Sequence, residues 1–163
     1  MNKPEQSYQV AIDGPAAAGK STIARLLAER LGGFYVNTGD MYRALAWAAR
    51  QNNIDVDNKP ESLAEQLPQW ELEYRRQENR SLQLFFNGEP ISQEKLRAPA
   101  VTAIVSQVAR IPQVRQWMLE RQRQCKSLGV IIMEGRDIGT VIFPQAKFKF
   151  FITASPLERA RRR

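Results

Sequence analysis

The sequence predicts an α/β fold in which a parallel sheet is flanked by helices. Strand and helix patterns alternate between residues 9 and 52, and buried strand patterns return after residue 129. A glycine-rich turn joins the first strand to the first helix. Because strands that alternate with helices pair in parallel through right-handed crossovers, these observations predict one main parallel sheet.

The first strand and the first helix lie on either side of the glycine-rich turn. Gln9–Asp13 is a short apolar run that ends at glycine and proline, which is typical of a buried strand. Between Ser21 and Leu31 apolar residues recur at helical spacing, and Gly32 with Gly33 supplies a stop signal. The residues at that spacing are Ile23, Leu26, Leu27 and Leu31.

A second strand and helix follow directly. Phe34–Asn37 predicts a strand, and Asp40–Asn52 predicts a helix. The helical apolar positions are Met41, Leu45 and Ala48.

The middle of the chain has a different pattern. Residues 70–74 and parts of 81–86 alternate apolar with polar side chains, with a turn at Glu78, Asn79 and Arg80 between them. Asn87-Gly88 is a second tight-turn signal, after which Pro90-Ile91 can pair with the hairpin. We therefore expect an antiparallel insert at roughly residues 55–92, followed by helices over residues 93–128.

The last third returns to the parallel pattern. Val130–Met133 and Lys147–Thr153 predict two further strands. Ser155 then caps a helix that begins at Pro156.

Composition limits the class of protein. The 163 residues suffice for one main core. No apolar run approaches the ~18 residues of a membrane span. The polar segment Met1–Gln9 lacks the pattern of a signal peptide. We therefore expect a cytoplasmic protein without a membrane partner.

Charge and residue usage narrow the chemistry. The net charge is +7, and four of the positive charges are arginines in the last five residues. There is one cysteine and no histidine, which excludes internal disulfides and histidine-based catalysis. The chain lacks basic stripes interleaved with aromatics, so we expect no nucleic-acid partner. Phosphoryl transfer stays open because it depends mainly on positioning and charge stabilisation.

The glycine-rich turn matches G-x-x-x-x-G-K-[ST], the phosphate-binding P-loop, between a predicted strand and a predicted helix. Backbone N–H groups of such a loop and the helix N-terminus bind phosphate oxygens. Lys20 would neutralise the β and γ phosphates of a nucleoside triphosphate, and the Ser21 hydroxyl would bind Mg²⁺. The expected nucleotide-binding residues are Gly14, Pro15, Ala16, Ala17, Ala18, Gly19, Lys20, Ser21 and Thr22.

Four segments together resemble the bacterial cytidylate kinase family, which consists of P-loop nucleoside monophosphate kinases. They are AIDGPAAAGKST (11–22), NTGDMYRALAW (37–47), SQVARIPQVR (106–115) and EGRDIGTVIFP (134–144). The resemblance spans essentially the whole chain. It implies transfer of the γ-phosphate of ATP to CMP or dCMP, with Mg²⁺, by a monomer.

The resemblance also implies a division of the chain and the roles of acceptor-binding residues. Residues 1–37 and 100–163 would form the P-loop core, and residues 38–99 the monophosphate-binding lobe. Arg43 and Arg136 match positions that hold the acceptor phosphate. Cytosine recognition is implied for Thr38, Ser106, Arg115 and Asp137.

Further residues have an expected part in the transfer itself. The resemblance places Arg159, Arg162 and Arg163 in a mobile lid that closes over the phosphoryl group, so Lys20, Arg136, Arg159 and Arg162 are the expected catalytic set. Glu134 ends a strand where P-loop enzymes place an acid near the Mg²⁺ water shell. For Asp13 two roles remain open, in the metal shell or as a brace for the loop.

Two departures from the family pattern matter. Asn37 and Asp40 replace the commoner acidic and small residues, and Thr-Gly-Asp is also similar to adenylate kinases. Family members also continue past Arg163 through the rest of the lid, a core strand and a final helix. We therefore expect the C-terminal part of the core to be missing here and activity to be low. The alternatives are another P-loop small-molecule kinase, of adenylate or uridylate type, or a non-catalytic nucleotide- or nucleic-acid-binding module.

Overall fold

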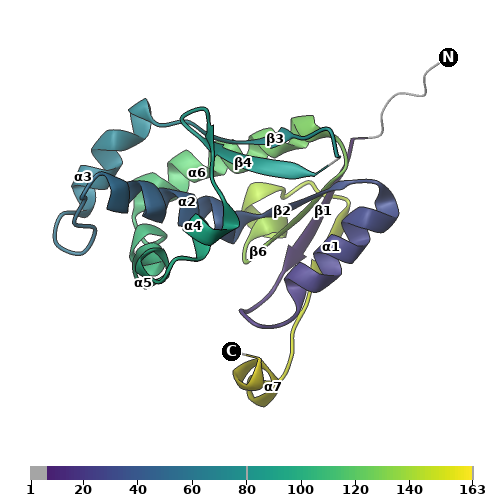
Figure 1. The fold of residues 1–163 in the computed structure, drawn as a ribbon. Helices are drawn as coiled ribbons and strands as arrows, with labels where there is room; N and C mark the ends of the chain where they lie inside the picture. The colour runs from purple at the N-terminus through teal and green to yellow at the C-terminus, as the bar shows by residue number, and fades with distance from the viewer. Residues whose placement is uncertain (1–6, 80, 163) are drawn as a thin grey trace. The chain divides into compact units, whose positions relative to one another are not determined.

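The computed structural model describes residues 7–79 and 81–162 and divides the chain into two compact units (Figure 1). The first unit is Met1–Thr38 with Arg123–Arg163, and the second is Gly39–Gln122. The second unit includes residues 100–122, which the sequence prediction placed with the core. The predicted turn residue Arg80 and the predicted lid residue Arg163 lie outside the described residues.

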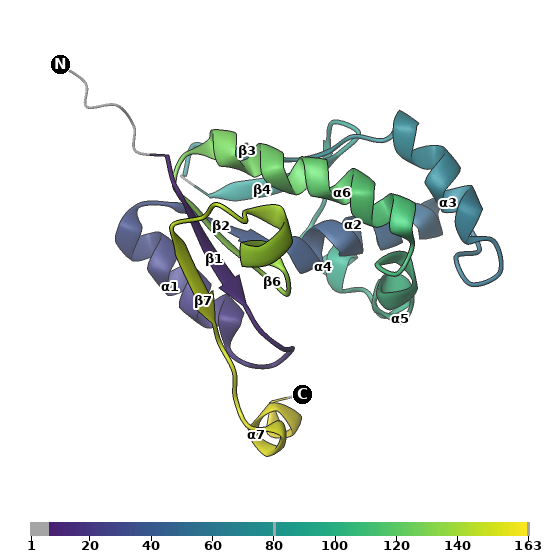
Figure 2. The same ribbon diagram turned by 180° about the vertical axis from the view of Figure 1, so that it is seen from behind.

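The first unit is built on a four-stranded parallel sheet in the order β2-β6-β1-β7. The strands are β1 (Gln9–Asp13), β2 (Phe34–Asn37), β6 (Ile131–Gly135) and β7 (Phe148–Phe151). In Figure 2 β1 and β7 run side by side, and the chain continues from β7 into α7 (Pro156–Arg161). The predicted α/β class with a parallel sheet is therefore confirmed.

Helix α1 (Lys20–Leu31) packs on this sheet through alanines. Ala24 and Ala28 are its buried residues, and they share a core cluster with Val10, Ile12 and Ile132. The predicted helix is confirmed, but its predicted apolar positions are largely outside the core: Ile23, Leu26 and Leu31 are 41–53% exposed. Small side chains let the helix approach the sheet closely, so the alanine face is the buried one.

After β6 the chain forms a turn of π-helix, η3 (Ile138–Ile142), that the sequence pattern did not predict. Its carboxyl end is held by Arg123, whose guanidinium donates to the carbonyl oxygens of Ile142 at 3.0 Å and Val141 at 2.8 Å. After β7, the Ser155 hydroxyl accepts a hydrogen bond from the backbone N–H of Glu158, which confirms the predicted cap of α7.

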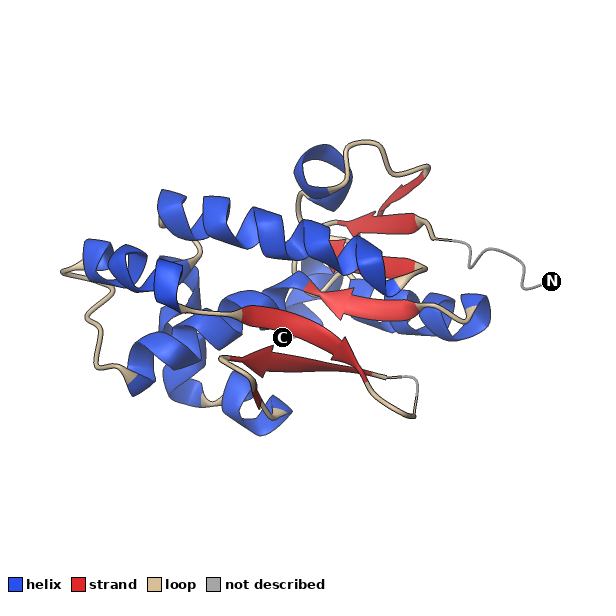
Figure 3. Ribbon diagram, turned by 90° about the horizontal axis from the view of Figure 1, so that it is seen from above, coloured by secondary structure: helices blue, strands red, loops and turns tan. Residues whose placement is uncertain are grey.

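The second unit combines helices with a three-stranded antiparallel sheet, β3-β4-β5. In Figure 3 the two long strands of this sheet run in opposite directions. The predicted hairpin and the pairing of the Pro90 segment are therefore confirmed. The strands are β3 (Leu72–Arg76), β4 (Leu82–Phe86) and β5 (Glu89–Pro90), and the short helices are α3 (Pro60–Gln66), η1 (Leu67–Gln69) and α4 (Gln93–Arg97).

Three longer helices complete the second unit: α2 (Thr38–Gln51), α5 (Pro99–Val108) and α6 (Pro112–Gln124). α2 begins at Thr38, the last residue of the first segment of the first unit. The chain re-enters the first unit at Arg123, near the end of α6, and η2 (Cys125–Leu128) follows. Their buried apolar residues form one cluster with the sheet, in which Phe86 contacts Trp47 and Trp70 edge to face. This shared core explains why residues 100–122 belong to the second unit.

Among the described glycines of the first unit, Gly14 has the least room for a side chain. Its φ is 146°, and a Cβ placed on it would lie 2.0 Å from the carbonyl oxygen of Ile152. Replacing Gly14 with alanine should therefore lower the free energy of unfolding by at least about 3 kcal/mol, measured by chemical denaturation.

Gly32 provides the matched control. Its φ is also positive, at 61°, but a Cβ there would meet nothing within 4 Å. Gly32→Ala should cost only about 1 to 2 kcal/mol, the cost of the backbone conformation alone. Equal losses for the two variants would contradict a steric role for Gly14.

Candidate active site

The loop between β1 and α1 has the backbone conformation of a phosphate cradle. Ala17 and Gly19 have φ values of 62° and 95°, and Gly19 caps α1 without a side-chain hydrogen bond. The N–H groups of the first turn of α1 therefore have no cap from Gly19 and can donate to an anion. A cavity of about 210 Å³ lies here, lined by Ala17, Ala18, Gly19, Lys20, Ser21, Thr22 and Arg162.

Lys20 lies within this loop and near three other charged groups. Its Nζ donates to the Pro15 carbonyl oxygen at 2.8 Å. Burial lowers the pKa of the Lys20 ammonium and nearby Arg136 lowers it further, whereas Glu134 and Asp13 raise it. The structure thus brings Lys20, Arg136, Glu134 and Asp13 into one electrostatic neighbourhood of the first unit.

Asp13 ties the phosphate loop to the segment after β6. Its two carboxylate oxygens accept hydrogen bonds from the backbone N–H groups of Ile138 at 2.7 Å and Gly139 at 2.8 Å. Asp13 is only 9% exposed, so these bonds are shielded from water. The Asp13 side chain thus acts as a brace, but for the segment after β6, whereas the sequence suggested a brace for the phosphate loop. Asp13 holds the start of η3, directly after Arg136 and Asp137.

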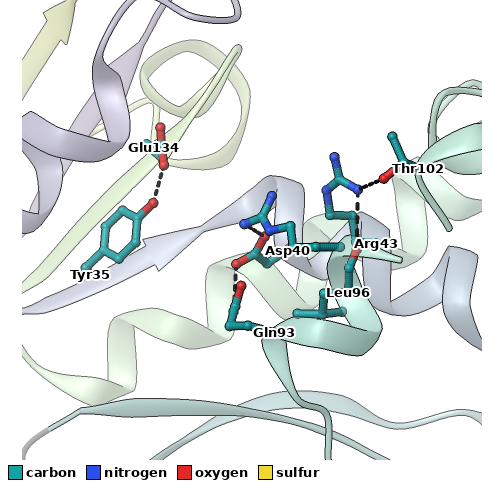
Figure 4. A network of polar contacts seen from close by, with 8 residues as sticks. Tyr35, Asp40, Arg43, Gln93, Leu96, Thr102 and Glu134 are labelled. Carbon is teal, nitrogen blue, oxygen red and sulfur yellow. Dashed lines mark hydrogen bonds and ion pairs between the residues drawn. The ribbon is translucent and has the colours of Figure 1, made fainter. Parts of the chain in front are cut away.

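Glu134 is buried at the end of β6 and is held from two sides. Thr38 Oγ1 donates to its backbone carbonyl at 2.9 Å, and Tyr35 Oη donates to its carboxylate. Figure 4 shows the Tyr35 hydroxyl directed at the Glu134 carboxylate. Burial, followed by the Glu134 carboxylate, raises the pKa of Tyr35 to about 12. Tyr35 was missed in the sequence, where a tyrosine in a strand has an ordinary structural explanation.

The other predicted residues of the first unit differ in exposure and contacts. Arg136 is exposed, and half-buried Asp137 precedes η3, where its carbonyl accepts from the N–H of Val141 at 2.9 Å. Arg162 lines the cavity and pairs with Glu158 at 2.9 Å, whereas Arg159 donates to the Ala154 carbonyl at 3.2 Å. Of these two described arginines, only Arg162 lines the cavity.

In the second unit Arg43 lies beside a second arginine. The guanidinium of Arg43 donates to Thr102 Oγ1 at 2.8 Å and to the Leu96 carbonyl at 3.3 Å (Figure 4). Burial and the charge of Arg97 lower the pKa of Arg43, and Asp40 raises it. Arg97 is itself paired with buried Asp40 at 2.6 Å. The sequence did not indicate that Arg97 pairs with Asp40, because the two residues lie 57 positions apart in the chain.

The last two predicted residues also belong to the second unit. Ser106 lies on α5 and Arg115 on α6, and both are exposed. Their predicted contact with cytosine stays a prediction, as does that of Thr38.

A larger cavity, of about 300 Å³, lies in the second unit between Arg50 and Ile104. Two carboxylates, Asp55 and Asp57, and one arginine line it, so its charge disfavours an anionic ligand. The phosphate loop is therefore the better candidate despite its smaller cavity.

Other kinds of site find little support within the described residues. Over residues 7–79 and 81–162 no cluster of three cysteine or acidic side chains is arranged to hold a metal ion. No helix in that part of the chain has the length and apolar character needed to cross a bilayer. Cys125 is buried, and burial raises the pKa of its thiol to about 12, so it is not a nucleophile at neutral pH.

Comparison with known proteins identifies the family. A family model described as cytidylate kinase matches residues 10–163. The chain belongs to the cytidylate kinase family. Cytidylate kinases are transferases, and the family implies ATP as the phosphate donor.

Individual cytidylate kinases align over nearly the whole chain. It is 48% identical to a cytidylate kinase of Pelotomaculum thermopropionicum, covering 94% of this chain and 67% of that protein. With a cytidylate kinase of Symbiobacterium thermophilum it shares 46% identity, covering 100% of this chain and 71% of that protein. A bifunctional pantoate ligase/cytidylate kinase of Synechococcus elongatus is 48% identical over 94% of this chain, which spans 30% of that larger protein.

The brace formed by Asp13 can be tested by one isosteric substitution. Asp13→Asn leaves one acceptor oxygen and turns an NH₂ group toward a backbone N–H, so one of the two buried hydrogen bonds is lost and the other no longer has a charged acceptor. We expect the free energy of unfolding to fall by about 2 kcal/mol in urea denaturation.

The exposed Asp57 supplies the control for this substitution. Asp57→Asn should change stability by less than about 0.5 kcal/mol. If Asp13→Asn were as stable as the unmodified protein, the carboxylate would not be the brace.

Proposed function

We propose that the protein transfers the γ-phosphoryl group of ATP to CMP or dCMP and forms the nucleoside diphosphate. The observation that carries this proposal is the loop from Gly14 to Ser21, which leads into α1 without a side-chain cap. Lys20 donates to the carbonyl of Pro15 in this loop and lies near Arg136 and Glu134. Membership of the cytidylate kinase family supports the choice of acceptor. We further propose that the protein acts as a monomer and binds no nucleic acid.

The residues of the first unit would act on the donor. Backbone N–H groups from Gly14 to Thr22 would bind the phosphates, and Lys20 would neutralise charge that develops on the β and γ phosphates. Arg162 and Arg159 would close over the phosphoryl group. Because the acceptor phosphate oxygen is itself the nucleophile, no protein general base is needed.

The chemistry of the donor atoms fits Mg²⁺. Ser21 offers a hydroxyl oxygen and Glu134 a carboxylate, and oxygen ligands are those that Mg²⁺ prefers. Ser21 would bind the ion directly, and Glu134 would bind through its water shell. When bound, the ion would supply positive charge that neutralises the phosphates.

The acceptor would be bound by a second set of residues. Arg43 and Arg136 would hold its phosphate through planar, permanently charged donors. Ser106, Arg115 and Asp137 would recognise the cytosine edge, with Asp137 accepting from the exocyclic amine, and Thr38 would assist them.

A coupled assay of ADP release tests this function. With ATP and Mg²⁺ present, CMP should accelerate ADP release more than AMP, UMP or shikimate does. Acceleration by another acceptor would indicate a different P-loop kinase. Nucleic-acid binding that weakens with salt, without any binding of CMP, would indicate a non-catalytic module.

Asp137 offers a test of base recognition. Uracil carries a carbonyl where cytosine carries the amine, so Asp137→Asn exchanges an acceptor for a group that can also donate. The ratio of kcat/KM for CMP to that for UMP should fall by about 10-fold or more.

Asp57→Asn again serves as the control and should leave this ratio unchanged. An unchanged ratio in Asp137→Asn would remove Asp137 from base recognition. In that case phosphorylation of CMP by the unmodified protein would still support the overall function.

A further inference from the structure

Asp40 is a buried charge of the second unit that the proposed reaction does not use. It lies in the first turn of α2, and its side chain is only 6% exposed. Arg43 follows three residues later, so the two side chains lie on the same face of this helix. A carboxylate that is removed from water needs charged or polar partners. The partners of Asp40 therefore show what this carboxylate holds in place.

Both partners of Asp40 come from α4. Arg97 Nη2 donates to one carboxylate oxygen at 2.6 Å, and Gln93 Nε2 donates to the other at 3.2 Å (Figure 4). Gln93 and Arg97 are four residues apart, which places them on one face of α4. The carboxylate thus connects α4 to the start of α2 and fixes the position of the Arg97 guanidinium.

The end of α4 also contacts Arg43. The carbonyl oxygen of Leu96, the residue before Arg97, accepts from Arg43 Nη1 at 3.3 Å. Thr102 Oγ1 accepts from the same nitrogen at 2.8 Å. The two arginines are therefore held side by side, one at Asp40 and the other at Leu96. In agreement with this geometry, burial and then the charge of Arg97 lower the pKa of Arg43.

Arg97 keeps hydrogen-bond donors for a ligand. Its side chain is 47% exposed, although that of its partner Asp40 is buried. Within the described part of the chain, Asp40 is the one side chain that accepts a hydrogen bond from Arg97. A guanidinium carries several N–H donors in a fixed fork, so the others can donate to an anion.

The charges of this region favour a phosphate monoester. Two guanidinium groups lie beside one carboxylate, and both oxygens of that carboxylate accept from α4. Neighbouring cations repel each other, and an anion that binds both of them removes this repulsion. The phosphate of a nucleotide carries about two negative charges at neutral pH and has several acceptor oxygens, so it can bind both arginines.

We infer that Arg97 is a second arginine that binds the phosphate of the acceptor nucleotide in this unit, beside Arg43. The inference deepens the proposed function and rests on it, because that proposal assigns Arg43 to the same phosphate. Asp40 does not touch the acceptor. It is a positioning residue that holds Arg97 together with Gln93.

The test removes Arg97 without leaving a buried charge unpaired. Arg97→Met alone would strand the Asp40 carboxylate and destabilise the fold. The comparison is therefore between Asp40→Asn, whose amide oxygen still accepts from Arg97, and the double variant Asp40→Asn/Arg97→Met. The Kd of CMP, measured by isothermal titration calorimetry, should be about 10-fold or more higher in the double variant, because a hydrogen bond between charged groups is lost.

Cytidine separates a phosphate contact from a general effect on the protein. It has the base and the ribose of CMP but no phosphate. Its Kd should therefore be the same in Asp40→Asn and in the double variant. Equal binding of cytidine also shows that both variants are folded.

An exposed ion pair in the same unit supplies the matched control. Arg75 Nε donates to Glu73 at 2.6 Å on β3, and both side chains are about as exposed as that of Arg97. Glu73→Gln and Glu73→Gln/Arg75→Met should bind CMP with equal Kd.

Two results would overturn the inference. One is an equal Kd of CMP in Asp40→Asn and in the double variant, and the other is an equal loss of affinity for CMP and for cytidine. Failure of the proposed function is a separate outcome, in which the unmodified protein binds neither ligand. Binding of CMP by the unmodified protein, together with equal Kd values in the two variants, would refute only the role of Arg97.

Discussion

The carboxylate of Asp13 is the point on which the arrangement of the first unit depends. Gly14, the next residue, opens the phosphate loop, while the side chain of Asp13 holds the backbone at Ile138 and Gly139. Each hydrogen bond to a charged group contributes about 1.5–3 kcal/mol. The backbone that begins the donor loop and the segment that carries Arg136 and Asp137 are therefore fixed to each other through one side chain.

The sheet gives this connection its stiffness. β1 lies between β6 and β7, with Asp13 opposite Gly135 in one neighbour and Phe151 in the other. The loop that follows β6 is thus fixed at its start by strand pairing and at its end by Asp13. A short loop tethered at both ends can keep charged side chains in place with little loss of entropy on ligand binding.

The charged side chains around the phosphate loop favour binding of an anion, because the basic and acidic groups there have other hydrogen-bond partners than one another. Lys20 is close to the carboxylates of Asp13 and Glu134, but the hydrogen bonds of these acids go to backbone N–H groups and to Tyr35. The ammonium of Lys20 donates to the neutral carbonyl of Pro15. Among the described residues no acidic side chain forms a salt bridge with this ammonium, so a triphosphate can bind it without first breaking one of these.

The sequence predicted the elements around this centre because their signals are local. A strand, eight residues of P-loop pattern and a helix follow one another directly, and the strict spacing of Gly14, Gly19 and Lys20 identifies the cradle. The hairpin of the second unit was similarly predictable from alternation and the Asn87-Gly88 turn.

The missed features depend on contacts between residues far apart in the chain. Tyr35 and Glu134 are 99 residues apart, and Asp13 reaches across 125 residues to shape η3. Helical spacing in α1 is shared by its leucines and its alanines, and only the close approach to the sheet selects Ala24 and Ala28. The pairing of Asp40 with Arg97 likewise has no local signature.

The proposed reaction transfers a phosphoryl group from ATP to the phosphate of a cytidine nucleotide. Phosphorus NMR of the protein with ATP, Mg²⁺ and CMP follows both products directly. We expect the resonances of CDP and ADP to grow in equal amounts while that of CMP declines. Formation of ADP with inorganic phosphate and unchanged CMP would contradict it.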